Sequence, residues 1–257
     1  MSIFSRKSIN QLMESTGYRI SKFRDEPTVH ADPLRIFNSL YGVRLNARRQ
    51  EHLASLGLPI AGKTVLEVGA GPGEHTHFFL DRGCKMLVTE IRDENLELLK
   101  QRYPEVALQK LDLEDPKLQG DEKFEVVYCY GLLYHLGKPD VAIKFMAERC
   151  KGILTMETCV SPGDELAVNL VREDPEEPSQ AFHGHGCRPT RPWIFAELKK
   201  HFPHVYLTRT QPCHEQFPID WTVPPKTELT RSVFVASMTP LANDTLSEQI
   251  LNQQVRH

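Results

Sequence analysis

The sequence predicts an α/β fold, a mostly parallel sheet of seven strands with helices on both faces. Two observations support this prediction. Short apolar runs alternate with longer amphipathic segments along most of the chain, which is the order expected of strands joined by crossover helices. The first of these runs, at residues 65–68, leads directly into a glycine-rich turn and a further helical pattern.

Each predicted element has a local reason. Residues 33–56 place apolar side chains at three-to-four spacing and predict a helix ahead of the first strand. The strands are expected at 63–68, 84–89, 105–110, 124–130, 153–157, 205–208 and 232–236. The other helices are expected at 74–82, 93–102, 138–149 and 193–201. Thr190 can cap the last of them, and Pro192 fits its first turn.

Three segments flank or interrupt the alternation. Residues 1–58 are expected to form an N-terminal helical segment, and residues 59–240 the α/β domain. Residues 160–190 are rich in Pro, Gly, Glu and His, and they read as an insertion in that domain. Residues 241–257 are polar and predict a frayed tail.

The composition is typical of a soluble globular protein. Of the 257 residues, 40% are hydrophobic and 25% charged; no apolar run approaches a membrane span, and the first residues lack the apolar core of a signal peptide. The six cysteines include no C-x-x-C pair, so we expect reduced thiols and a cytoplasmic location. The net charge of −3 argues against a protein that holds long nucleic acid by its backbone.

The turn after the first strand predicts a nucleotide-like cofactor. Gly69, Gly71 and Gly73 alternate there, so the backbone can pass close to a ligand where a Cβ would collide. The helix that follows points its first amides at that ligand. Glu90 ends the second strand, where an acidic side chain can accept hydrogen bonds from a ribose diol.

Two carboxylates favour one cofactor class over another. A dinucleotide turn of the G-x-G-x-x-G type would need a glycine at position 74, and this chain has Glu74 there, beside where a pyrophosphate would lie. Glu67, just before the first glycine, suits a cofactor with a cationic sulfonium and an ammonium group. The turn therefore favours S-adenosylmethionine over a nicotinamide dinucleotide.

With these motifs the chain resembles the class I S-adenosylmethionine-dependent methyltransferases. The resemblance is carried by E-V-G-A-G-P-G at 67–73, Thr89-Glu90, Leu111-Asp112-Leu113 and F-E-V-V-Y-C-Y-G at 124–131. It covers residues 60–160 well and 190–240 loosely. It implies a Rossmann-like fold whose last strand is antiparallel, and an N-terminal segment that can close over the cofactor as a lid.

The resemblance also implies which residues hold S-adenosylmethionine. Those near the glycine turn would hold its methionine part, Glu90 its ribose and Asp112 its adenine. The full set of expected cofactor-binding residues is Glu67, Gly69, Ala70, Gly71, Gly73, Glu90, Ile91, Asp112, Leu113 and Tyr130.

Histidines after the fourth and fifth strands are the candidate catalytic groups. His135 follows the fourth strand, at the sheet edge where ligands bind in this topology, and could act as a general base. It could instead only line the cofactor pocket. His183 and His185 lie in a glycine-rich loop that could supply a base, form a lid or be merely solvated. A metal held with Glu157 is conceivable, but H-x-H without a defined third ligand is poor evidence, and no metal site is predicted.

Basic and aromatic residues near these histidines are candidates for acceptor binding. Tyr134, Arg188 and Arg191 could contact the substrate, the arginines through an anionic group. The other basic stretch contains Arg48 and Arg49, in the helix before the first strand, and reads more readily as a solvated helix face.

The sequence thus predicts a methyltransferase that acts on a small molecule, most simply at a hydroxyl oxygen of a sugar or natural product. Three alternatives remain open. The loop at 131–136 also resembles that of enzymes acting on the wobble uridine of tRNA. Nitrogen could be methylated instead of oxygen, and a regulatory protein could bind the cofactor without catalysis. We expect no nucleic-acid or membrane partner, and the oligomeric state is not predicted.

Overall fold

One eight-stranded sheet organises the part of the chain that the structure, a computed structural model, describes, residues 37–257. The start of the helix predicted at 33–56 and most of the predicted lid lie outside the described residues. The strand order is β11-β8-β10-β5-β4-β1-β2-β3. The strands are β1 (Thr64–Val68), β2 (Lys85–Glu90), β3 (Ala107–Lys110), β4 (Phe124–Tyr130), β5 (Cys150–Val160), β8 (His204–Thr208), β10 (Thr230–Ser237) and β11 (Leu246–Ser247).

The directions of the strands confirm the predicted α/β fold. β1 pairs in parallel with both β2 and β4, and these pair in parallel with β3 and β5. β10, the last of the seven predicted strands, is antiparallel to both of its neighbours. The eighth strand, β11, is a two-residue edge strand that sequence analysis missed.

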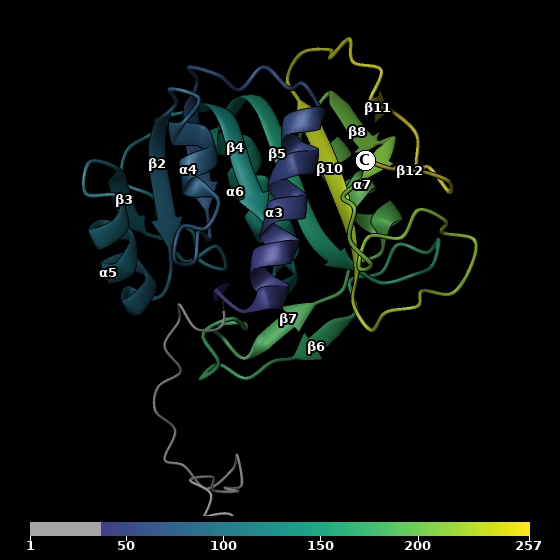
Figure 1. Cartoon of the computed structure of the whole chain (residues 1–257), viewed down its shortest axis with the longest axis horizontal. Coiled ribbons are helices and arrows are strands. Elements are labelled where there is room, and N and C mark those ends of the chain that lie inside the picture. Colours follow the sequence, from purple (N-terminus) through teal and green to yellow (C-terminus); the bar gives the residue numbers. More distant parts are fainter. Residues whose placement is uncertain (1–36) are drawn as a thin grey trace, which may run out of the picture. The chain divides into compact units, whose positions relative to one another are not determined.

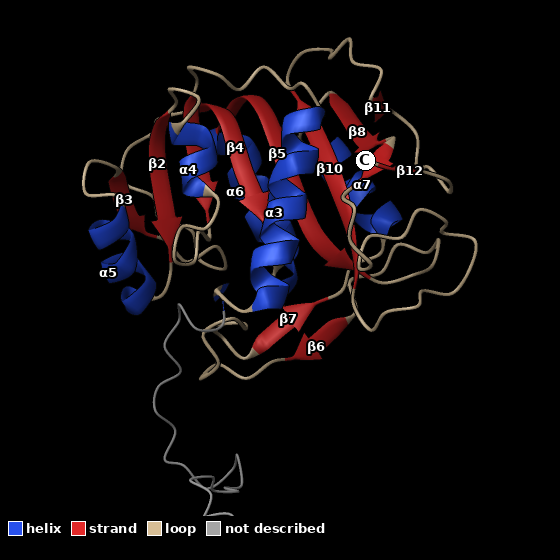
Figure 2. Ribbon diagram, viewed as in Figure 1, coloured by secondary structure: helices blue, strands red, loops and turns tan. Residues whose placement is uncertain are grey.

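Helices cover both faces of the sheet, as predicted (Figures 1 and 2). They are α3 (Leu40–Ser55), α4 (Thr76–Leu80), α5 (Asp93–Arg102), α6 (Pro139–Arg149) and α7 (Arg191–Lys199), with a 3-10 turn, η1 (Leu133–His135). Successive strand residues face opposite ways. Val65 therefore packs in one apolar cluster with residues of α3, α4 and α5, and Leu66 in a second cluster with residues of α6 and α7.

The helix predicted at 74–82 is shorter than expected. The glycine turn continues to His75, and α4 begins only at Thr76 and ends at Leu80. Thr190 caps α7 as predicted, because its hydroxyl oxygen accepts a hydrogen bond from the Trp193 amide at 3.4 Å. None of the helices in the described part of the chain is long and apolar enough to cross a membrane.

The predicted insertion at 160–190 contains a small hairpin at the carboxyl ends of the parallel strands. Its strands, β6 (Leu170–Arg172) and β7 (His185–Cys187), pair antiparallel and lie beneath α3 in the view of Figure 1. The Cys187 thiol donates to the Leu133 carbonyl at 3.4 Å, so the hairpin is attached to η1. This contact brings the insertion to the sheet edge where a ligand is expected.

The tail at 241–257 is folded onto the sheet, contrary to the frayed segment predicted. β11 pairs with β8, and β12 (Val255–Arg256) pairs with β9 (Thr210–Gln211). Between them the side chain of Gln254 is buried and makes three hydrogen bonds: its Oε1 accepts from Gln211 and Trp221, and its Nε2 donates to the Thr208 carbonyl. Composition misled the prediction because these polar side chains bind one another.

Replacing Gln254 with alanine should therefore destabilise the protein. Gln254→Ala leaves several buried polar groups without partners, and we expect the free energy of unfolding to fall by about 1–3 kcal/mol in urea titrations. Asn252→Ala, on an exposed side chain of the same segment, is the matched control and should stay within about 0.5 kcal/mol of the native protein. Equal stability of all three proteins would show that the buried hydrogen bonds of Gln254 contribute nothing to the stability of the fold.

Candidate functional site

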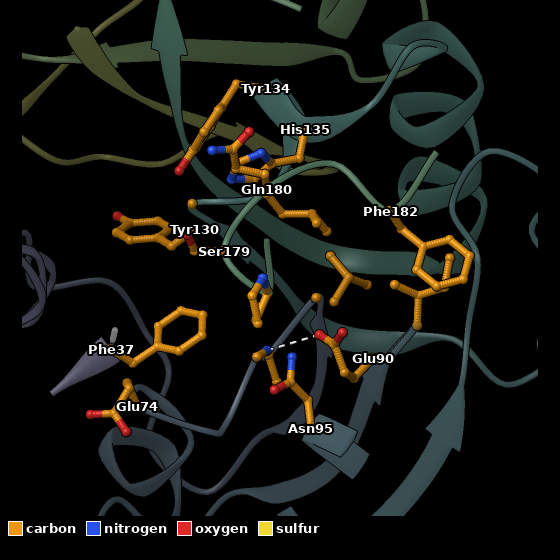
Figure 3. Close-up of a pocket in the computed structure, with 18 of the residues that line it drawn as sticks. Phe37, Glu74, Glu90, Asn95, Tyr130, Tyr134, His135, Ser179, Gln180 and Phe182 are labelled. Carbon is orange, nitrogen blue, oxygen red and sulfur yellow. Dashed lines mark hydrogen bonds between the residues drawn. The ribbon is translucent and has the colours of Figure 1, made fainter. Parts of the chain in front are cut away.

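A cavity of about 570 Å³ opens at the carboxyl ends of β1, β2 and β4, under α3 and the insertion. Every residue predicted to bind the cofactor lines it except Gly73. Figure 3 shows Glu90 and Asn95 at one end of this cavity and Tyr134 and His135 at the other. The tertiary structure thus brings all but one of the predicted cofactor residues and two of the three candidate bases, His135 and His183, into a single space.

Two positions of the turn require glycine, because each has a positive φ and leaves no room for a Cβ. Gly69 has a φ of 62°, and a Cβ there would lie 2.4 Å from the Leu132 side chain. Gly73 has a φ of 84°, and its Cβ would meet the Tyr103 ring at 2.6 Å. Both values lie in the left-handed region, which L side chains rarely adopt. Gly73 therefore serves packing beneath the turn rather than contact with a ligand.

Glu90 is fixed at the edge of the cavity by backbone amides. Its Oε2 accepts from the Gly71 amide at 2.9 Å, and its Oε1 accepts from the Arg92 amide at 3.0 Å. A carboxylate offers about four acceptor positions, so both oxygens can still accept a further hydrogen bond. The carboxylate is therefore held in place by the backbone and keeps acceptor positions for a ligand.

Glu67 lies buried beneath the turn and faces the cavity. The Thr76 hydroxyl donates to its Oε2 at 2.7 Å, and burial raises the pKa of the carboxyl from its ordinary 4.5 to about 8. Near neutral pH this side chain is therefore mostly protonated. A cation placed beside it would shift it toward the ionised form.

The carboxylate of Asp112 contacts both the loop after β3, to which it belongs, and the insertion. Its Oδ1 accepts from the Glu114 amide at 2.8 Å, and its Oδ2 lies 2.8 Å from His183 Nε2. His183 therefore lines the end of the cavity with the predicted cofactor residues. His185 does not line the cavity; its ring faces the His183 carbonyl at 3.2 Å.

The insertion forms a wall over the cavity and is held there by Arg92. The Arg92 Nη2 donates to the carbonyls of Pro175, Glu177 and Gln180 at 3.1–3.3 Å. Gln180 and Phe182 line the cavity, and Gln180 lies beside His135 in the view of Figure 3. Residues remote in sequence thereby enclose the site.

At the opposite end, His135 lies in a network with two groups of the insertion. Its Nδ1 contacts Glu173 Oε2, and Arg188 donates to Glu173 Oε1 at 3.0 Å. Burial lowers the pKa of His135 below its ordinary value, although the contact with Glu173 acts to raise it. The imidazole is therefore neutral near pH 7.

Of the three residues predicted to bind the acceptor, Tyr134 and Arg188 line the cavity and Arg191 does not. The guanidinium groups of Arg188 and Arg231 lie 5.1 and 4.9 Å from the centroid of the Tyr134 ring. Arg191 instead stacks on Trp221 at 3.7 Å and donates to the Leu251 carbonyl at 2.7 Å. The structure thus places Arg191 in the packing of the C-terminal segment.

Arg49 is buried, which corrects the predicted solvated helix face. Of the two arginines predicted on that face, Arg48 faces solvent, where it pairs with Glu51. Arg49 Nη2 lies 2.7 Å from Glu157 Oε2, and Arg231 Nη1 lies 3.1 Å from Glu157 Oε1. This cluster lies beside the cavity, which both arginines line.

Sequence reasoning missed several residues of the site. Asn46 and His75 line the cavity, and the Asn46 carbonyl oxygen lies 3.1 Å from His75 Nε2. A signal for Asn46 was present in the sequence, since it lies three residues before Arg49 and so on the same helix face. No such signal marked His75. Nothing in the sequence singled out Glu173. Residues 37–257 contain no group of three or more His, Cys, Asp or Glu side chains arranged to hold a metal.

Comparison with known proteins finds a family match in the centre of the chain. Residues 65–152 match the model of a family described as "Methyltransferase domain". A tRNA U34 carboxymethyltransferase from Shewanella piezotolerans is 32% identical over 151 residues, which cover 53% of this chain and 44% of the relative. One from Vibrio vulnificus is 30% identical over 146 residues, with the same coverage. The chain spans less than half the length of these curated relatives.

Solved structures share the fold at lower identity. The N-terminal domain of EvdMO1, crystallised in the presence of SAH and D-fucose, has a TM-score of 0.57 and 22% identity, covering 91% of this chain and 97% of that one. The 1,6-didemethyltoxoflavin-N1-methyltransferase of Burkholderia thailandensis has a TM-score of 0.53 and 20% identity, covering 86% and 94%. The predicted Rossmann-like α/β architecture is therefore confirmed.

The raised pKa of Glu67 predicts a stability that falls as pH rises. The folded state keeps a proton on Glu67 up to about pH 8, whereas the unfolded chain loses it near 4.5, so stability is lost across that window. Glu67→Gln, which keeps an acceptor for Thr76, should raise the free energy of unfolding by about 2–4 kcal/mol at pH 8 and by less than about 1 kcal/mol at pH 5.

Denaturant titrations at the two pH values measure this difference. Glu105→Gln, on an exposed side chain, is the control and should change stability little at either pH. A stabilisation by Glu67→Gln that is the same at pH 5 and pH 8 would contradict a buried, protonated Glu67.

Proposed function

We propose that this chain, which carries a methyltransferase domain of the class I type, transfers a methyl group from S-adenosylmethionine to a hydroxyl oxygen of a small molecule. One observation supports this above others. A single cavity joins a glycine turn and Glu90, suited to the cofactor, to His135, suited to activating an acceptor.

The residues around the glycine turn fit S-adenosylmethionine. Glu90 keeps lone pairs for a ribose diol after binding two backbone amides. The buried carboxyl of Glu67 would be favoured in its ionised form by the cationic groups of the cofactor. Ile91 and Leu113 offer apolar surface for the adenine, and Asp112 offers a polar edge.

Bound there, S-adenosylmethionine would supply a methyl group on a cationic sulfur, open to in-line displacement. A hydroxyl acceptor must lose its proton as its oxygen attacks. His135 can take that proton on Nε2, because its imidazole is neutral near pH 7 and Nδ1 is occupied by Glu173. Tyr134, packed against the imidazole at a centroid distance of 3.9 Å, limits the movement of the base.

The size and enclosure of the cavity support a small acceptor. Pockets for small molecules range over about 300–1,000 Å³, and a cavity of about 570 Å³ would hold the cofactor with only a compact partner. The insertion covers the site through Arg92 and His183. Two proteins of the same fold are named with D-fucose and with 1,6-didemethyltoxoflavin, so hydroxylated sugars and heterocycles form the first screen.

A second candidate is suggested by the curated relatives, which are named as tRNA U34 carboxymethyltransferases. In that reading the acceptor is the wobble uridine of tRNA. The net charge of −3 weighs against a backbone-binding surface. Incubation with total tRNA and a labelled donor, of methyl in one arm and of carboxymethyl in the other, alongside the small-molecule screen, distinguishes the two acceptors by which one takes up label.

Calorimetric titration with S-adenosylhomocysteine tests the cofactor. We expect saturable one-to-one binding, weakened about 10-fold or more by Glu90→Gln, which replaces one acceptor oxygen with a donor amide. Glu94→Gln, nearby on α5 and outside the cavity, is the matched control and should bind as the native protein does. Absence of binding at millimolar ligand, with nicotinamide dinucleotides binding instead, would overturn the cofactor assignment.

Removing the proposed base should slow turnover without loosening the cofactor. With an acceptor from the screen, His135→Ala should lower kcat by about two orders of magnitude or more, since a positioned base contributes that much. The affinity for S-adenosylhomocysteine should change little. His201→Ala, in a residue outside the cavity, controls for loss of a histidine as such. Unchanged turnover in His135→Ala would remove this residue from the mechanism.

A further inference from the structure

The carboxylate of Glu173 contacts His135, Arg188 and the Ala181 amide, and the proposed function gives it no role of its own. Glu173 follows β6 in the insertion, and its side chain is only 6% exposed. Its Oε2 contacts His135 Nδ1 and accepts from the Ala181 amide at 2.8 Å, while its Oε1 accepts from Arg188 at 3.0 Å. Both oxygens are therefore occupied by groups of η1 and the insertion.

These contacts keep Glu173 ionised. Burial acts to raise the pKa of its carboxyl, but the hydrogen bonds from His135, Arg188 and the Ala181 amide together hold that pKa below its ordinary value. An ionised carboxylate can only accept hydrogen bonds. Nδ1 of His135 must therefore carry the proton that it shares with Glu173.

The tautomer of His135 follows from this contact. With the proton on Nδ1, a neutral imidazole has its lone pair on Nε2. His135 Nε2 makes no hydrogen bond to any side chain or backbone group of residues 37–257, and the ring lines the cavity. The charged groups that act on the pKa of the His135 ring are Glu173, which raises it, and Arg188 and Arg231, which lower it.

We propose that Glu173 is a positioning residue that fixes His135 in the Nδ1-protonated tautomer and so leaves Nε2 free to accept the proton of the acceptor. This inference rests on the proposed function, since it assigns a role toward the base named there. It also makes the insertion part of the machinery: the base is oriented correctly only when the insertion is seated against η1.

The packing of the hairpin supports this coupling. At Gly186 in β7, a Cβ would lie 2.4 Å from the Tyr134 carbonyl oxygen and 2.8 Å from Glu173 Oε1. Only glycine lets β7 lie this close to η1. Arg188, one residue after β7, donates to the Tyr134 carbonyl at 3.0 Å and holds Glu173 from the other side.

The experiment reads the tautomer directly and needs no acceptor. Long-range proton–nitrogen correlation spectra of the full chain, labelled with ¹⁵N-histidine, report which ring nitrogen carries the proton; loss of the signal in His135→Ala assigns it. In the native protein at pH 7.5 we expect Nδ1 protonated and Nε2 bare. A native His135 with its proton on Nε2 would overturn the proposal without any substitution.

Glu173→Gln then tests whether the carboxylate is the cause. Its amide can donate to Nδ1, so the population of the Nε2-protonated tautomer should rise, while S-adenosylhomocysteine binds within about 3-fold of native. With an acceptor in hand, kcat should fall about 100-fold or more at similar KM, because the wrong tautomer presents no lone pair. Glu176→Gln, on an exposed residue of the same insertion, should match the native protein in all these measurements.

These readouts separate this inference from the proposed function. A protein that fails to bind S-adenosylhomocysteine but shows the expected tautomer contradicts the function and leaves the geometry of Glu173 and His135 intact. A protein that binds the ligand but keeps the same tautomer and kcat in Glu173→Gln overturns the positioning role alone.

Discussion

A buried carboxylate between two guanidinium groups holds together the elements on which the cavity depends. Glu157, near the end of β5, lies between Arg49 of α3 and Arg231 of β10. Charges removed from water are stable only when paired, and stripping one partner from such a group costs about 3–5 kcal/mol. The cluster therefore fixes α3 across the carboxyl ends of the strands, and α3 in turn supplies Leu45, Asn46 and Arg49 to the cavity lining.

The insertion completes what the sheet alone leaves open. The sheet and its glycine turn place Glu67 and Glu90 near the carboxyl ends of β1 and β2, where both line the cavity. The covering wall comes from residues 172–183, held by Arg92 and by the contact of His183 with Asp112. Because the same segment carries Glu173, the enclosure of the site and the orientation of His135 depend on one piece of chain.

Much of the fold could be predicted because it rests on local periodicity. Alternating apolar runs and amphipathic segments located the seven main strands, and the cap at Thr190 located α7. The failures were of a different kind. The tail at 241–257 is polar by composition, yet Gln254 is buried because its amide binds Gln211, Trp221 and a backbone carbonyl. Partners more than thirty residues away in the chain leave no mark on local composition.

The features of the site likewise separate into those predicted from local sequence and those that depend on tertiary contacts. The sequence by itself determined the strand–glycine turn–helix unit, the acidic group at the end of β2 and the histidine after β4, because each is a particular residue type at a fixed position relative to a predicted strand. Only the tertiary structure decided that Arg49 is buried rather than solvated, that His185 and Arg191 lie outside the cavity, and that Glu173 meets His135. The physical reason is that burial and ion pairing depend on which segments the packed sheet and insertion bring together, and neither is encoded in the spacing of neighbouring residues.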